Sequence, residues 1–196
     1  MMEMTRKAAL EAGAVALGGV LVGGVVLGEH AEPALSRPSA KQDAEILNFA
    51  LLLEYVQAAF YTEGLSRAGL TGELKEFAST VAAQEQEHIA FLKKALGSAA
   101  IKSPTFDFGK AVTDQATFAA TAQVLEDTGV SAYLGQVGNI SQKGVLSAAG
   151  TIATVEARHA AWIRFINKDV PAPAAFDTPK SEKAILKAVT ATGFIK

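Results

Sequence analysis

The strongest constraint in this sequence is a helical spacing of apolar residues that repeats in four long blocks. From Lys41 onward, apolar residues return every three or four positions, the spacing of one helix face, and strand-type alternation is absent. The blocks span about 42–67, 72–96, 113–139 and 141–169. Each block can bury its apolar stripe only against the others, so the sequence predicts an all-α four-helix bundle.

The connections between the blocks differ in length. Short turns join the first block to the second and the third to the fourth, whereas the segment 97–112 between the two pairs has no helical period. This segment predicts a long crossover between helices 2 and 3. A Pro-rich linker then precedes an amphipathic stretch at about 180–190, which predicts a short C-terminal helix. We expect the bundle to occupy 41–170 and a C-terminal extension to occupy 171–196.

The first forty residues differ in composition from the rest. Thr5, Arg6 and Lys7 precede an uncharged run rich in Gly and Ala over 12–28, and a polar segment with prolines follows. This order is typical of an export signal, here with Lys7 in place of the second arginine of a twin-arginine signal. We expect residues 1–40 to direct export to the periplasm or the cell exterior. The alternative is a retained membrane anchor, which would be the chain's only contact with a membrane.

Ionisable side chains interrupt the middle of every stripe, where a helix packed into a core should be apolar. The second and fourth blocks carry a Glu and a His three positions apart on one helix face, and the first and third carry a lone Glu. These residues are Glu54, Glu85, His88, Glu126, Glu156 and His159. Burying an isolated carboxylate costs several kcal/mol unless it is paired or binds a cation. Two divalent cations would cancel the four charges, with one His completing each coordination sphere, so the pattern predicts a two-metal site.

The six positions also fall into two similar halves. Glu54 precedes Glu85 by 31 residues, and Glu126 precedes Glu156 by 30. The chain is therefore a duplicated helix pair, whose halves can face each other about a pseudo-twofold axis. The alternative is that the Glu and His pairs are surface residues or satisfied polar groups of the core, but it does not account for the lone Glu one hairpin upstream of each pair.

Two tyrosines, Tyr61 and Tyr133, lie two helical turns after the lone Glu of each half. A buried hydroxyl needs a partner, so we expect each to bond a metal-bound carboxylate, with plain packing or a redox role as alternatives. The nearby acids Glu87 and Asp127 point to other helix faces and are expected to be solvated. Because the chain contains no cysteine, thiolate ligands are excluded and any metal must be held by oxygen and nitrogen.

The chain resembles the ferritin-like superfamily of di-iron carboxylate proteins, and within it the family that includes plant desiccation-related proteins and exported bacterial homologues. The resemblance covers most of 41–196. It is carried by ILNFALLLEY at 46–55, EQEH at 85–88, FDFG at 106–109, LEDTGVSAYLG at 125–135 and VEARHA at 155–160. In bacterioferritin-like members a tyrosine also follows the lone Glu by two turns, as Tyr61 and Tyr133 do. The absence of cysteine excludes a rubredoxin-type centre such as that of rubrerythrin.

The resemblance implies a ferritin-like bundle with two metal ions, iron or alternatively manganese, and three functions follow as hypotheses. In the first, two Fe(II) ions bridged by Glu85 and Glu156 react with O2 or peroxide, as in a ferroxidase or oxidase. The terminal ligands would be Glu54, His88, Glu126 and His159. In the second, a di-manganese centre disproportionates peroxide, as in manganese catalases. In the third, the protein is a non-enzymatic stress or desiccation-related protein whose metal site is structural.

The expected partners are small molecules, namely Fe(II) and O2 or peroxide. The net charge of -2, with basic residues scattered along the chain, argues against a nucleic-acid partner. A homodimer is compatible with the sequence. A 24-subunit cage is not expected, because the crossover and the C-terminal tail differ from those of ferritins.

Overall fold

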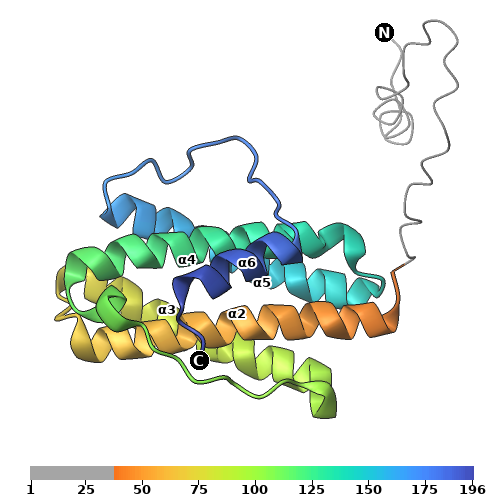
Figure 1. Ribbon diagram of the computed structural model, residues 1–196. Coiled ribbons are helices and arrows are strands. Elements are labelled where there is room, and N and C mark those ends of the chain that lie inside the picture. Colours follow the sequence, from red (N-terminus) through yellow and green to blue (C-terminus); the bar gives the residue numbers. More distant parts are fainter. Residues whose placement is uncertain (1–37) are drawn as a thin grey trace, which may run out of the picture. The chain divides into compact units, whose positions relative to one another are not determined.

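The computed structural model describes residues 38–196 and contains five α-helices there, which confirms the predicted all-α bundle with a short C-terminal helix (Figure 1). The helices are α2 (Ala40–Arg67), α3 (Gly72–Leu96), α4 (Gln115–Gln136), α5 (Lys143–Ile166) and α6 (Glu182–Thr192). None of them is long and apolar enough to cross a membrane. Residues 1–37 of the predicted export signal or anchor lie outside the described residues.

Local backbone chemistry sets the helix ends close to where the sequence places them. Asp114 caps α4 by accepting the N–H of Thr117 at 2.9 Å, as its position before the third block predicts. Helix α3 stops at Gly97, whose positive φ of 56° is costly for a residue with a Cβ. Helix α4 ends at Gln136 rather than near Asn139, because Val137–Asn139 tighten into a 3-10 turn.

The four long helices form two hairpins, α2 with α3 and α4 with α5, which pack against each other (Figure 1). The crossover between the hairpins contains two 3-10 turns, Gly97–Ala99 and Gly109–Val112, and no α-helix. This confirms the long connection between the second and third bundle helices. Helix α2 also contacts α4, and α3 contacts α5, so the four long helices enclose one shared interior.

An aromatic cluster fills the bundle on one side of the six ionisable residues. Phe60 stacks on Phe118 with ring centroids 4.7 Å apart and meets Phe108 of the crossover edge-on at 5.5 Å. All three rings are buried. Gly64 permits this packing, because a Cβ there would lie 2.1 Å from the Phe118 ring. The crossover is thus anchored in the core through Phe108.

The C-terminal extension packs onto the same core. Ile185 and Val189 of α6 are buried against it. After α6, the chain pairs with the crossover through one antiparallel bridge between Phe106 and Ile195, which is the only β-type pairing in residues 38–196. Helix α6 and the crossover therefore hold each other against the bundle.

Asp43 of α2 caps the start of α5 from across the bundle. Its carboxylate accepts the N–H of Ser141 at 2.8 Å, the hydroxyl of Ser141 at 3.0 Å and the N–H of Gln142 at 2.9 Å. Gln142 itself supplies no side-chain cap. Because Asp43 is only 1% exposed, this contact fixes the start of α5 against α2, and with it the level at which α5 presents its Glu and His.

We expect Asp43→Asn to lower the free energy of unfolding by about 2 kcal/mol, because a neutral amide accepts more weakly and turns a donor toward backbone N–H groups. Urea denaturation of the metal-free protein at pH 7, followed by circular dichroism, measures the change. Glu45→Gln is the control, since Glu45 is exposed on the same helix, and it should cost less than about 0.5 kcal/mol. An Asp43→Asn variant as stable as the wild type would show that the cap does not hold α5.

Candidate metal centre

The structure brings all six predicted residues together in the interior, at the middle of the four long helices. Glu54, Glu85, Glu126 and Glu156 have no exposed surface, and His159 is 3% exposed. His88 is slightly more open, with 12% of its side chain exposed. Four fully buried carboxylates within one bundle need strong compensation by positive charge.

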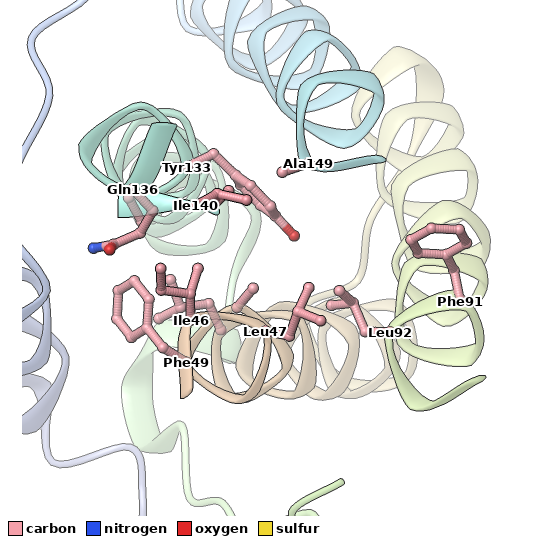
Figure 2. Close-up of a pocket in the computed structure, with 12 residues that line it drawn as sticks. Ile46, Leu47, Phe49, Phe91, Leu92, Tyr133, Gln136, Ile140 and Ala149 are labelled. Carbon is pink, nitrogen blue, oxygen red and sulfur yellow. The ribbon is translucent and has the colours of Figure 1, made fainter. Parts of the chain in front are cut away.

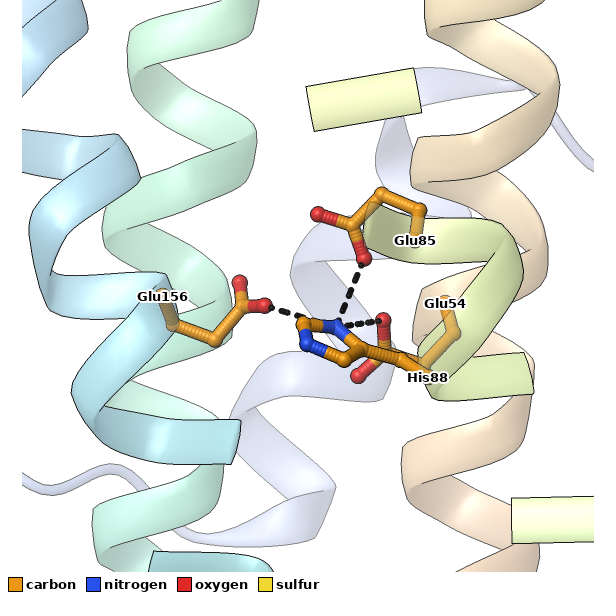
Figure 3. A group of neighbouring side chains, drawn as sticks. All are labelled: Glu54, Glu85, His88 and Glu156. Carbon is orange, nitrogen blue, oxygen red and sulfur yellow. Dashed lines mark hydrogen bonds and ion pairs between the residues drawn. The ribbon is translucent and has the colours of Figure 1, made fainter. Parts of the chain in front are cut away.

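The first group of ligand-type atoms surrounds His88 and is called the His88 position here (Figure 3). Nδ1 of His88 lies 3.2 Å from Oε2 of Glu54, 3.3 Å from Oε2 of Glu85 and 3.4 Å from Oε1 of Glu156. One ligand atom from each of these four residues lies within 4.8 Å of the others. Three carboxylates and one imidazole can hold one divalent cation here.

The second group, called the His159 position, mirrors the first. Nδ1 of His159 lies 3.2 Å from Oε2 of Glu126, 3.4 Å from Oε1 of Glu85 and 4.0 Å from Oε1 of Glu156. The four residues again offer ligand atoms within 4.8 Å of one another. Glu85 and Glu156 belong to both groups, so they lie where bridging carboxylates of a two-metal site would lie.

Unpartnered buried atoms supply the test of whether metals fit these residues. Among the described residues, four buried side-chain atoms have no hydrogen-bond partner: Glu85 Oε1, Glu126 Oε2, Glu156 Oε1 and His159 Nδ1. They are the ligand-type atoms of the His159 position. Orphaned buried polar atoms are rare and costly, and oxygen and imidazole nitrogen ligands suit Fe and Mn. The residues therefore fit a metal ion, although ligation by all six remains a prediction.

The two tyrosines lie beside the carboxylates, and they do so across the pseudo-twofold axis. The Tyr61 hydroxyl of the first half donates to Oε1 of Glu126 at 2.5 Å, and that of Tyr133 in the second half donates to Oε1 of Glu54. Each therefore serves the Glu of the opposite hairpin. Burial, together with the charges of Glu126 and Glu54, raises both phenol pKa values well above 10, so both hydroxyls stay protonated donors.

Two glutamines contact the site, and the sequence analysis did not assign either to it. Nε2 of Gln57 donates to Oε1 of Glu126 at 3.1 Å and to Oε2 of Glu156 at 3.3 Å. Oε1 of Gln84 lies 2.6 Å from Nε2 of His159. The sequence could have predicted Gln57 as a site residue, because it is a polar residue on the apolar stripe one turn after Glu54. Nothing in the sequence pattern predicts Gln84 as a site residue, because it is half-buried and lies beside the apolar stripe of its helix rather than on it.

Burial and mutual repulsion shift the pKa values of the metal-free cluster. Burial first, and then repulsion by Glu85, raises the pKa of Glu54 to about 8, while burial and the charge of Glu54 raise that of Glu156 to about 7. Burial would lower the histidine pKa values, but the neighbouring carboxylates outweigh it and raise them to about 12 for His88 and about 10 for His159. Without metal, the cluster therefore retains protons in place of cations.

Two neighbouring features complete the description of the site. Glu87 is exposed, as expected, but Asp127 is not simply solvated, because Arg164 pairs with it through Nε at 3.0 Å and through an NH2 group at 2.5 Å. A small cavity of about 20 Å³ lies one helical turn from the cluster, lined by apolar side chains that include Ile46 and Leu92 (Figure 2). Tyr133 forms part of its wall and reaches Glu54 with its hydroxyl.

Comparison with known proteins agrees with this geometry. The family model described as a ferritin-like domain matches residues 42–169, the span of the four-helix bundle. No curated protein sequence matches the chain. The match covers well over half of the chain and includes all six residues of the cluster, and it confirms the resemblance to the ferritin-like superfamily. The chain belongs to the ferritin-like family.

Proposed function

We propose that the protein is a ferritin-like oxidase that binds two iron ions at the His88 and His159 positions and oxidises Fe(II) with O2. The observation that carries this proposal is the set of four buried ligand-type atoms that face one another without a hydrogen-bond partner. Family membership supports it. When bound, two Fe(II) ions would each give one electron to O2, which takes up two protons and leaves as hydrogen peroxide.

The chain's own residues would contribute charge, orientation and exclusion of water. Glu85 and Glu156 lie between the two histidines and would be shared by both cations. Tyr61 and Tyr133 each donate to one oxygen of a terminal carboxylate, which leaves the other oxygen free to face the metal position. Full burial of the carboxylates lowers the local dielectric and so strengthens their attraction for cations.

The apolar cavity beside Tyr133 favours O2 over peroxide as the oxidant. Its volume of about 20 Å³ has room for one molecule of the size of water or O2. The walls are formed by side chains such as Ala50, one turn before Glu54, and Leu92, one turn after His88. Apart from Gln136 and Tyr133, these walls offer hydrogen peroxide no hydrogen-bonding side chain, whereas O2 has no hydrogen bonds to lose.

Export from the cytoplasm is part of the same proposal. It is supported by the order of basic, apolar and polar segments in residues 1–40. Edman sequencing of the protein from the periplasm or medium should find a new N-terminus within or just after this segment. A chain with an intact N-terminus that sediments with membranes would instead indicate an anchor.

Oxygen uptake after anaerobic loading tests the proposed reaction. Metal-free protein given two equivalents of Fe(II) should consume about one O2 per two Fe(II), faster than the same Fe(II) in buffer. Glu156→Gln should bring the rate down to that of buffer, because both positions lose a ligand, whereas Glu87→Gln should leave it unchanged, since Glu87 is exposed. Fe(II) oxidation no faster than in buffer would refute the proposal. Release of O2 from peroxide by the manganese form alone would replace it with the catalase reaction.

A further inference from the structure

The two halves of the cluster correspond residue by residue, with two exceptions. Glu54 and Glu126 are 72 positions apart, as are Tyr61 and Tyr133, and each Glu and His pair repeats after 71 positions. At the same offsets, Gln57 corresponds to Gly129 and Gln84 to Val155. Both glutamines lie in the first half, and both contact residues of the second half.

The first exception places an amide against two carboxylates of the His159 position. Nε2 of Gln57, which is 3% exposed, donates to Glu126 and Glu156, and only the NH2 end of its amide can face two carboxylates. Gly129 leaves the room for it, because a Cβ there would lie 2.7 Å from Oε2 of Glu156 and 3.5 Å from Nε2 of Gln57. The hydrogen bond from Gln57 holds Oε2 of Glu156, and Oε1 of the same carboxylate remains available to a metal ion.

The second exception fixes the ring of His159. Oε1 of Gln84 can only accept, so Nε2 of His159 carries the hydrogen of the 2.6 Å contact. In the neutral imidazole, Nδ1 then carries the lone pair that a metal needs, and it faces Glu85 and Glu126. Gln84 therefore fixes the orientation of the ring, so that Nδ1 faces the metal position and becomes the ligating nitrogen once a metal displaces its proton.

His88 lacks this support. Its counterpart of Gln84 is Val155, which has no side-chain hydrogen-bonding group, and in the described part of the chain no hydrogen bond reaches Nε2 of His88. The His88 side chain is also 12% exposed, against 4% for His159. His159 is thus both better oriented and more deeply buried than His88.

We propose that the two metal positions are inequivalent, an inference that rests on the proposed two-metal function. The His159 position binds its ion first and more tightly, because Gln84 and Gln57 hold its ligands ready. The His88 position holds the more exchangeable ion, at the more open side of the cluster. The ion at the His88 position would therefore exchange with solution faster than the ion at the His159 position.

Titration of the metal-free full chain with Co(II), followed by visible absorbance and isothermal calorimetry, tests the order of binding. The wild type should bind two ions in two resolved steps. Gln84→Leu should weaken the first step by a factor of about 10–100, the usual effect of losing a residue that orients a ligand, and leave the second step nearly unchanged. Gln86→Leu is the matched control on the same helix, because Gln86 is exposed, and it should change neither step.

Histidine variants assign each step to a position. His88→Ala should keep one tight Co(II) ion, whereas His159→Ala should lose the tight step and keep at most a weak one. Two equal steps in the wild type, or loss of the tight step in His88→Ala alone, would overturn the inference while leaving the two-metal function standing. Absence of any Co(II) binding by the wild type would overturn both.

Discussion

Replacing Glu85 with glutamine is expected to remove both metal ions from the protein. Oε2 of Glu85 lies 3.3 Å from Nδ1 of His88, and Oε1 lies 3.4 Å from Nδ1 of His159, so one carboxylate serves both positions. Taking one partner from a buried charge pair costs about 3–5 kcal/mol, which is a factor of roughly 10²–10⁴ in affinity at each position. Metal analysis by mass spectrometry after gel filtration measures the loss.

Glu85→Gln should lose its metal ions without unfolding. Glutamine keeps the volume of the side chain, and it removes a negative charge that raises the pKa of Glu54 by repulsion. The metal-free variant should therefore be at least as stable at pH 8 as the metal-free wild type. Glu87→Gln on the same helix is the control, since Glu87 is exposed, and it should retain both ions. Retention of two ions by Glu85→Gln would show that Glu85 is not a shared ligand.

The predictable part of this fold and site rests on local periodicity. Apolar stripes of helical spacing are encoded within single blocks, so the helices and the long crossover could be placed from sequence. The six ionisable residues stood out because each interrupts a stripe that packing requires to be apolar. Asp114 and Gly97 gave two helix ends because capping chemistry is local.

Contacts between distant segments could not be predicted in the same way. The sequence placed Tyr61 and Tyr133 near the carboxylates, but only the packing of the hairpins shows that each donates to the Glu of the opposite half. The role of Gln57 depends on the gap at Gly129, which lies 72 residues away. Capping of α5 by Asp43 is likewise a contact between α2 and a turn almost 100 residues later. Such contacts depend on how the helices pack against each other, and the helical periodicity of a single block carries no information about that packing.

The metal-free protein is expected to lose stability as pH rises, because its cluster holds protons that the unfolded chain releases. The pKa of Glu54 is about 8 in the folded protein and 4.5 for the same group in an unfolded chain. Between these two pH values, only the folded protein keeps this proton. Stability falls with pH wherever the folded state binds more protons. His88 and His159 act in the same direction above pH 6.5, since their folded pKa values are about 12 and about 10.

Metal removal should therefore cost far more stability at pH 8 than at pH 5. Glu54 alone accounts for about 3–4 kcal/mol across this range, which for a domain of this size is roughly 7–15 °C in Tm. Bound cations replace the protons, so the metal-loaded protein should keep its Tm as pH rises. Scanning calorimetry of both forms at pH 5, 6, 7 and 8 measures the difference, and Glu54→Gln should flatten the slope of the metal-free form. A metal-free Tm that stays level or rises from pH 5 to 8 would mean that cations are not what these four carboxylates need.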